Sequence, residues 1–169
     1  YISVRARWTQ KMFRAIDGRD CAYTPDPVFA LNKNAKELLL NKEDIQKKFN
    51  LPDKYVLISL TGQTLSENSL HRIKALFDTH GISCVYLPMP NSVGYRHNFE
   101  HMIPDALDPM DWYCLIKYST GYIGSNMHPI IVCLHNAVPC FSIDFWGRVD
   151  FWNRPICDGS SKVEDILKR

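Results

Sequence analysis

Short apolar runs alternate with amphipathic segments along this chain, and that alternation limits the folds open to it. Residues 55–60 and 82–87 are apolar on both faces and are bounded by proline, threonine or glycine, which is typical of buried strands. The segment 64–81 carries apolar residues at helical spacing, opens with a capping-box pair, Thr64 and Glu67, and ends at glycine. This order of elements predicts a parallel sheet covered by helices on both faces.

The same pattern continues on both sides of this unit. Residues 2–4 predict a first strand, and Asp108-Pro109 supplies an N-cap and a first-turn proline for a later helix. The helix after the first strand is expected to turn four large side chains inward: Trp8, Met12, Phe13 and Ile16. The other expected elements are a strand at 121–124, a buried helix around 130–134, a strand at 138–143 and a closing helix at 162–168. We therefore predict a single Rossmann-like domain over residues 1–169, a three-layer α/β sandwich with a mostly parallel sheet.

The composition excludes several classes of protein. Hydrophobic residues make up 46% of the chain, which is enough for a packed core and argues against disorder. The net charge is only +2 and the Lys and Arg residues are scattered, so no nucleic-acid surface is expected. No run approaches the roughly 18 apolar residues of a membrane span. We expect a cytoplasmic protein, either free or held at the inner face of the membrane.

The six cysteines form no CxxC pair, and Cys84, Cys133 and Cys140 lie in apolar runs. Buried free cysteine behaves as a small hydrophobe, so reduced core thiols are expected in place of a disulfide or zinc framework. His97 and His101 have the spacing of a metal pair on a helix, but no third ligand is evident in the sequence. No metal site and no organic cofactor are predicted.

Parallel sheets bind ligands where the strands end and the chain turns into a helix. The first such loop contains Ser125, Asn126 and His128, just before the expected buried helix. Free N–H groups at a helix start favour an anion, and an imidazole titrates near neutral pH. His128 is therefore the leading catalytic candidate. The alternative is that it caps the helix or bonds a neighbouring carbonyl.

Other charged residues follow strands in the same way. Arg5 comes just after the first strand and offers a planar fork suited to carboxylate or phosphate, although a solvated arginine is the alternative. Asp144 and Arg148 follow the strand at 138–143, where a loop-stabilising role for Asp144 is equally open. Asp26 lies between two prolines, and there we favour a structural role.

Five segments, taken in order, resemble the polysaccharide pyruvyl transferase family of bacteria. They are Ser3-Val4-Arg5, Thr24–Phe29, Gly124–His128, the stretch from Val138-Pro139 through Asp144 to Arg148, and Ser161-Lys162-Val163. They cover nearly the whole chain. The resemblance implies the second of two Rossmann-type halves arranged as in GT-B glycosyltransferases. Because the chain opens at Tyr1 in an apolar run, we also expect a missing N-terminal half of a longer protein.

The resemblance implies transfer of a pyruvyl group from phosphoenolpyruvate to a sugar of a cell-surface polysaccharide, as a ketal. The acceptor would be a saccharide or a lipid-linked glycan. By that analogy His128 is the acid/base group, Asp144 orients it or an acceptor hydroxyl, and Arg5 and Arg148 hold the anionic groups of the donor. Ser125 and Asn126 would assist from the helix start.

The sequence departs from the family at two positions. Asn126 stands where the family usually has arginine, and Ala6 replaces an aspartate that often follows the early arginine. These changes keep two alternatives open: a GT-B glycosyltransferase that uses a nucleotide sugar, and a non-catalytic homologue that binds a glycan precursor. The acceptor sugar, the linkage and the oligomeric state do not follow from the sequence.

Overall fold

The computed structural model of the protein describes residues 2–60, 65–89, 99–143, 150–152, 154, 156 and 161–167. Its centre is a sheet of five parallel strands in the order β5-β4-β3-β6-β7. The strands are β3 (Tyr55–Ser59), β4 (Ser83–Tyr86), β5 (His101–Met102), β6 (Gly121–Gly124) and β7 (Cys140–Ser142). The predicted parallel sheet is confirmed.

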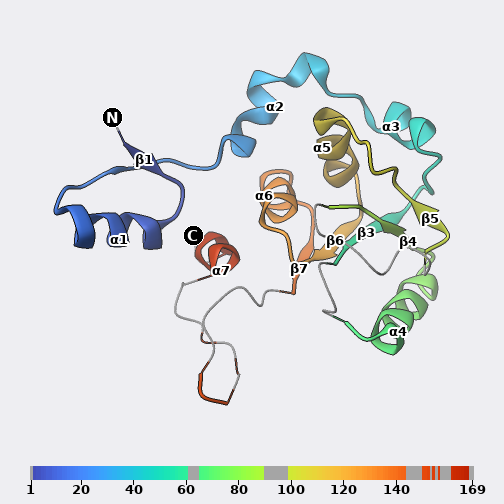
Figure 1. Cartoon of the computed structure of the whole chain (residues 1–169). Helices are drawn as coiled ribbons and strands as arrows, with labels where there is room; N and C mark the ends of the chain where they lie inside the picture. The colour runs from blue at the N-terminus through green and yellow to red at the C-terminus, as the bar shows by residue number, and fades with distance from the viewer. Residues whose placement is uncertain are drawn as a thin grey trace.

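Helices cover both faces of this sheet (Figure 1). On one face lie α3 (Lys42–Lys48), α5 (Pro109–Lys117) and α6 (Met127–His135), and on the other lies α4 (Glu67–Asp78). The central strand β3 is apolar throughout because its alternate side chains enter two separate clusters. Tyr55 and Leu57 pack with α3, α5 and α6, whereas Val56 and Ile58 pack with α4. The predicted three-layer, Rossmann-like sandwich is therefore confirmed.

The N-terminal residues form a small βαβ unit beside the main body (Figure 1). It consists of β1 (Ser3–Val4), α1 (Arg7–Asp17) and β2 (Ala22–Tyr23), and β1 pairs in parallel with β2. The predicted first strand exists, but it belongs to this two-stranded sheet and not to the main one. Short helical turns lead from it to the body: η1 (Pro27–Ala30), α2 (Leu31–Asn34) and η2 (Lys36–Leu38).

The prediction that α1 turns its apolar side chains inward is wrong. Within α1, which the structure describes in full, no side chain is buried. Trp8 and Ile16 are 48% and 79% exposed. The physical reason is that, within the described residues, α1 packs mainly against the two short strands β1 and β2, too narrow a surface to cover an amphipathic helix.

The helix starts follow the capping chemistry of the sequence, with one correction. Asp108 caps α5 as predicted. Ser66 caps α4, its Oγ accepting a hydrogen bond from the backbone of the third helical residue, whereas the expected cap, Thr64, lies outside the described residues. A last helix, α7 (Lys162–Leu167), follows Ser161 and packs against α6.

Gly124, the last residue of β6, lies where no side chain can be accommodated. A Cβ atom added there would collide with the Tyr122 hydroxyl and with the Ser59 carbonyl oxygen, and the latter belongs to the neighbouring backbone. We expect Gly124→Ala to lower the free energy of unfolding by about 1–3 kcal/mol, the usual cost of overpacking. Chemical denaturation measures the loss. Gly121→Ala in the same strand is the control, because its added Cβ would be 3.3 Å from the Pro139 oxygen; an equal loss in both variants would contradict this explanation.

Candidate functional site

The helix α6 starts directly at the carboxyl end of strand β6. Asn126 occupies its N-cap position but makes no side-chain cap; its Nδ2 instead donates to Ser59 Oγ at the end of β3, at 3.3 Å. Ser125 is 2% exposed, and its backbone N–H donates to the Ser59 carbonyl oxygen at 3.4 Å. These contacts fix the start of α6 on the sheet, and the Asn126 side chain does not cap the first turn.

Three charged or titratable side chains meet beside this helix start. Arg5 follows β1, Asp26 lies between β2 and η1, and His128 is the second residue of α6. Arg5 Nη1 donates to Asp26 Oδ2 at 2.5 Å. His128 Nε2 lies 3.7 Å from the same carboxylate oxygen. The structure thus brings together two predicted site residues, Arg5 and His128, through a third residue, Asp26.

The exposure of the three residues differs in a way that suggests a division of roles. Asp26 is only 6% exposed, whereas the side chains of Arg5 and His128 are 52% and 47% exposed. A buried carboxylate is costly unless it is paired and hydrogen-bonded. Asp26 meets this condition, because it also accepts a hydrogen bond from the Val28 backbone N–H at 3.1 Å. The buried carboxylate thus anchors Arg5 and His128, while both side chains remain accessible to a ligand.

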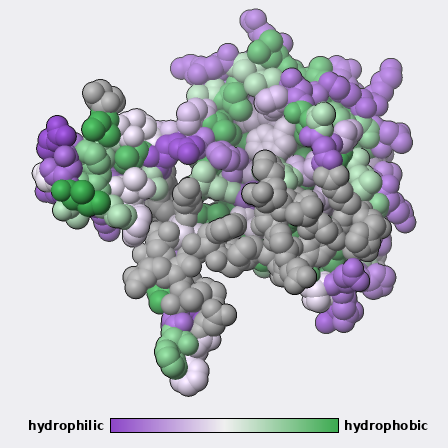
Figure 2. Space-filling view, in the orientation of Figure 1, coloured by the Kyte–Doolittle hydropathy of each residue, from purple (hydrophilic) through white to green (hydrophobic). Residues whose placement is uncertain are grey.

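A cavity of about 280 Å³ adjoins Arg5, between the N-terminal unit and helices α6 and α7. Figure 2 shows the surface hollowed between the N-terminal unit and the body. The cavity is lined by Arg5, by Ala6 and Thr9 at the start of α1, by Met127 at the start of α6, and by Ile166 of α7. Two helix N-termini therefore face one small cavity.

These two helix starts differ chemically from those of α3, α4 and α5. In α1 and α6, both described in full, the N-cap residue makes no side-chain cap and no acidic residue stands in the first turn. In contrast, α3, α4 and α5 each have a capping side chain and an acidic residue in the first turn. Uncapped N–H groups and the positive end of the helix dipole favour an anion. With Arg5 in its wall, the cavity is suited to a small anionic molecule.

The other predicted site residues are placed less favourably or are not described. Ser125 is buried and its backbone N–H is engaged by Ser59, so its position supports a structural contribution. Asp144 and Arg148 lie outside the described residues. Asp26 was expected to be structural, and the structure places it at the centre of the cluster. The only sequence signal for it was its rigid setting between Pro25 and Pro27.

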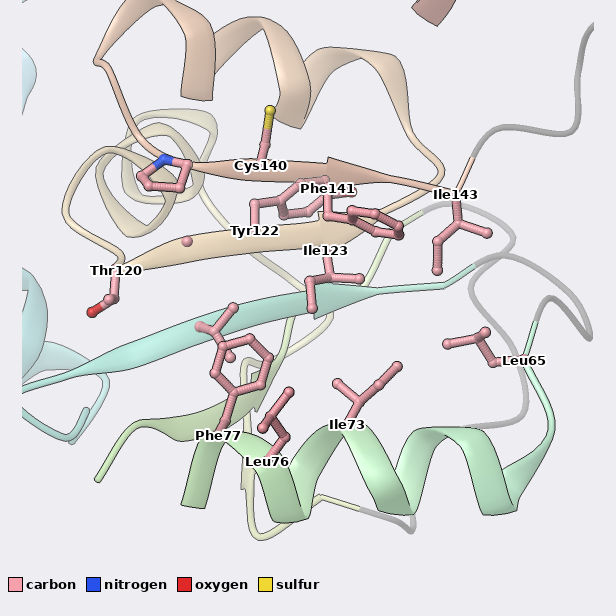
Figure 3. Close-up of a pocket in the computed structure, with 13 residues that line it drawn as sticks. Leu65, Ile73, Leu76, Phe77, Thr120, Tyr122, Ile123, Cys140, Phe141 and Ile143 are labelled. Atoms are coloured by element: carbon pink, nitrogen blue, oxygen red, sulfur yellow. The ribbon is translucent and has the colours of Figure 1, made fainter. Parts of the chain in front are cut away.

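A larger cavity, of about 710 Å³, lies on the opposite face of the sheet, between α4 and strands β6 and β7 (Figure 3). Its walls are apolar and include Leu65, Ile73, Phe77, Ile123, Phe141 and Ile143. Among the described residues that line it, none carries a charge. This cavity therefore lacks the groups needed for chemistry on an anion, and the Arg5–Asp26–His128 cluster remains the candidate site.

The described residues also limit the kind of site. Among them, no group of three His, Cys, Asp or Glu side chains is placed to hold a metal ion. Within the same part of the chain, no helix is long and apolar enough to cross a membrane.

The sequence matches a known protein family. The family described as polysaccharide pyruvyl transferase matches residues 1–146, which is most of the chain. Among curated proteins, none matches the sequence.

Solved structures with the same fold include two kinds of enzyme. A Methanocaldococcus jannaschii UDP-GlcNAc 2-epimerase, in complex with UDP-GlcNAc and UDP, is similar with a TM-score of 0.64 and 12% identity, over 84% of this chain and 44% of that chain. The wall teichoic acid polymerase TagF is similar with a TM-score of 0.51 and 17% identity, over 84% of this chain and 38% of that one. The chain thus spans less than half the length of these proteins, and at such identities the likeness shows the fold alone.

Proposed function

The chain belongs to the polysaccharide pyruvyl transferase family, and we propose that it forms part of an enzyme that transfers a pyruvyl group from phosphoenolpyruvate to a sugar as a ketal. The observation that carries the proposal is the meeting of Arg5 and His128 on one buried carboxylate, beside a cavity that faces two uncapped helix starts. Such a site is suited to a small donor with more than one negative charge.

The donor has two anionic groups, and the site offers two kinds of partner for them. Arg5 would bind the carboxylate or the phosphate through its planar fork. The first-turn N–H groups of α1 and α6 would bind the other group, as helix N-termini commonly do. Asn126 brings no charge where the family usually has arginine, so Arg5 carries more of the binding. Arg148 is proposed as a second cationic partner.

The reaction requires proton transfers and two additions at one carbon. A proton is added to the methylene carbon of phosphoenolpyruvate, and a sugar hydroxyl attacks the central carbon. Inorganic phosphate then leaves, and a second sugar hydroxyl attacks the same carbon to close the ketal. We assign the proton transfers to His128, a role worth about 10²–10⁴-fold in rate. Asp26 would position His128 and Arg5, and Asp144 is proposed to orient His128 or an acceptor hydroxyl.

The proposal also includes the acceptor and the place of the reaction. The acceptor would be a saccharide or lipid-linked glycan, bound in the cytoplasm or at the inner face of the membrane, where phosphoenolpyruvate is available. An N-terminal half of the same protein would complete the cleft. The exposed apolar side chains of α1, including Trp8 and Ile16, offer a surface for it.

Binding of the donor gives the first test of this proposal. In the complete protein, phosphoenolpyruvate at about 100 times its dissociation constant is expected to add about 2.7 kcal/mol to the free energy of unfolding. Arg5→Gln should remove most of the resulting shift in melting temperature, because it removes the cation in the cavity wall. Arg14→Gln, which breaks an exposed pair with Asp20, is the matched control and should leave the shift unchanged.

Two alternatives predict different outcomes of the same measurement. The fold is shared with a structure that holds UDP-GlcNAc, so a glycosyltransferase using a nucleotide sugar is the second candidate. It predicts stabilisation by UDP-sugars and none by phosphoenolpyruvate, which would overturn the proposal. A non-catalytic homologue predicts stabilisation by a glycan precursor without release of phosphate from phosphoenolpyruvate.

A further inference from the structure

Helix α6 and strand β7 bring two cysteines together outside the candidate site. Cys133 lies in the last turns of α6 and is fully buried, while Cys140 opens β7 and is partly exposed. The two thiols lie close enough to interact directly with each other. Figure 3 shows the Cys140 sulfur directed from β7 toward α6. Both belong to or pack against the same core cluster.

The environment makes the two thiols chemically unequal. Interaction with the neighbouring Cys133 S–H favours the thiolate form of Cys140 and lowers the pKa of Cys140. The same interaction, together with burial, raises the pKa of Cys133. Burial raises the pKa of Cys84 to about 11 and also raises the pKa of Cys114. Cys140 is thus the reactive member of the pair, because it is partly exposed whereas Cys133 is fully buried, and the thiolate is the nucleophilic form of cysteine.

We propose that Cys133 and Cys140 form an oxidation site, at which a peroxide converts the two thiols into a disulfide. In the first step the Cys140 thiolate attacks one oxygen of hydrogen peroxide, the O–O bond breaks, and protonation of the leaving oxygen gives water and a Cys140 sulfenic acid. In the second step the Cys133 sulfur attacks the Cys140 sulfur and forms the S–S bond. The hydroxyl leaves with the Cys133 proton as a second water, so one peroxide oxidises two thiols.

The location of the pair determines what oxidation would change. The disulfide would close the short turn between α6 and β7, which contains Ala137 at a positive φ of 54°. It would join the end of α6 covalently to the strand beside β6. Helix α6 carries His128 in its first turn, so the oxidised bond would hold the same helix on which the candidate site is built. The oxidation itself does not depend on the proposed reaction.

Peptide mapping tests the site directly. The complete folded protein is treated with limiting hydrogen peroxide near neutral pH, blocked with N-ethylmaleimide under denaturing conditions and digested with trypsin. Cleavage after Lys117 and Arg148 leaves both cysteines in one peptide, residues 118–148. We expect this peptide to carry no alkylation and to be lighter by two hydrogen atoms than the same peptide with two free thiols. The peptides of Cys84 and Cys114 should stay alkylated. Full alkylation of residues 118–148 after peroxide treatment would overturn the proposal.

Two variants separate the attacking thiol from the resolving one. In Cys133→Ser the sulfenic acid at Cys140 has no partner, so dimedone should label Cys140 about tenfold faster than Cys84, as expected for the more thiolate-like group. In Cys140→Ser, dimedone should not label Cys133 because that residue is buried and stays protonated. Labelling of Cys133 in the second variant, or equal labelling of Cys84 and Cys140 in the first, would contradict the assignment.

Discussion

Replacing His128 with asparagine is expected to lower kcat for phosphate release from phosphoenolpyruvate by about 10²–10⁴-fold, the usual contribution of a general acid or base. Asparagine keeps a hydrogen-bonding side chain of moderate size at the start of α6 but cannot exchange a proton near neutral pH. His128 is about half exposed, so its replacement should change the melting temperature of the complete protein little. Binding of phosphoenolpyruvate should be retained, because Arg5 and the helix N–H groups remain.

The matched control for this variant lies on the same helix. His135 is the last residue of α6, and its ring packs edge-on against Phe29 with the centroids 6.0 Å apart. His135→Asn changes the same residue type at the opposite end and should leave phosphate release near the wild-type rate. If His128→Asn turned over as fast as His135→Asn, the proton transfers would have to be assigned to another group.

The main sheet was predictable from the sequence because its strands and helices are encoded by the spacing of apolar residues within short segments. A strand buried on both faces must be apolar at consecutive positions, and β3 and β4 show this directly. The helix between them has one apolar face, and α4 turns that face to Val56 and Ile58. Periodicity therefore identified both the elements and the layers that they form.

The N-terminal unit was less predictable because periodicity describes a face and not its partner. The spacing of Trp8, Met12 and Ile16 correctly indicates an amphipathic helix, but the pattern contains no information on what covers it. The structure leaves these side chains exposed on α1. The sequence of a two-residue strand likewise does not indicate which sheet the strand joins, so the pairing of β1 with β2 could not be predicted.

Of the three residues in the cluster, the sequence indicated the two accessible ones, Arg5 and His128, but not the buried Asp26 between them. Arg5 and His128 follow strands, a position that sequence alone reveals. Asp26 gains its importance from contacts with residues far away in the chain, Arg5 on one side and His128 on the other. A buried acid that joins two basic groups is a property of the fold, and the flanking prolines were its only local sign.

Replacing Asp26 with asparagine is expected to have the second large effect on the reaction. Asparagine can still accept the hydrogen bond from the Val28 N–H, since it is an effective capping residue. It removes the charge that holds Arg5, so the free energy of unfolding should fall by about 1.5–3 kcal/mol, as for loss of a hydrogen bond to a charged group. A displacement of about 1 Å in the positioned groups can cost about 10²-fold in rate, and we expect a fall of that size in kcat/KM.

Steady-state kinetics and a double-mutant cycle identify what Asp26 positions. If it positions mainly Arg5, KM for phosphoenolpyruvate should rise, and the effects of Asp26→Asn and Arg5→Gln should be less than additive because both break one pair. If it positions mainly His128, kcat should fall instead.

Asp17→Asn breaks the exposed pair with Arg19 and is the matched control, since surface ion pairs contribute only about 0–1 kcal/mol. Asp26→Glu keeps the charge and should restore part of the activity, because the carboxylate can still reach a guanidinium. Kinetics of Asp26→Asn equal to those of Asp17→Asn would show that the buried carboxylate serves folding alone.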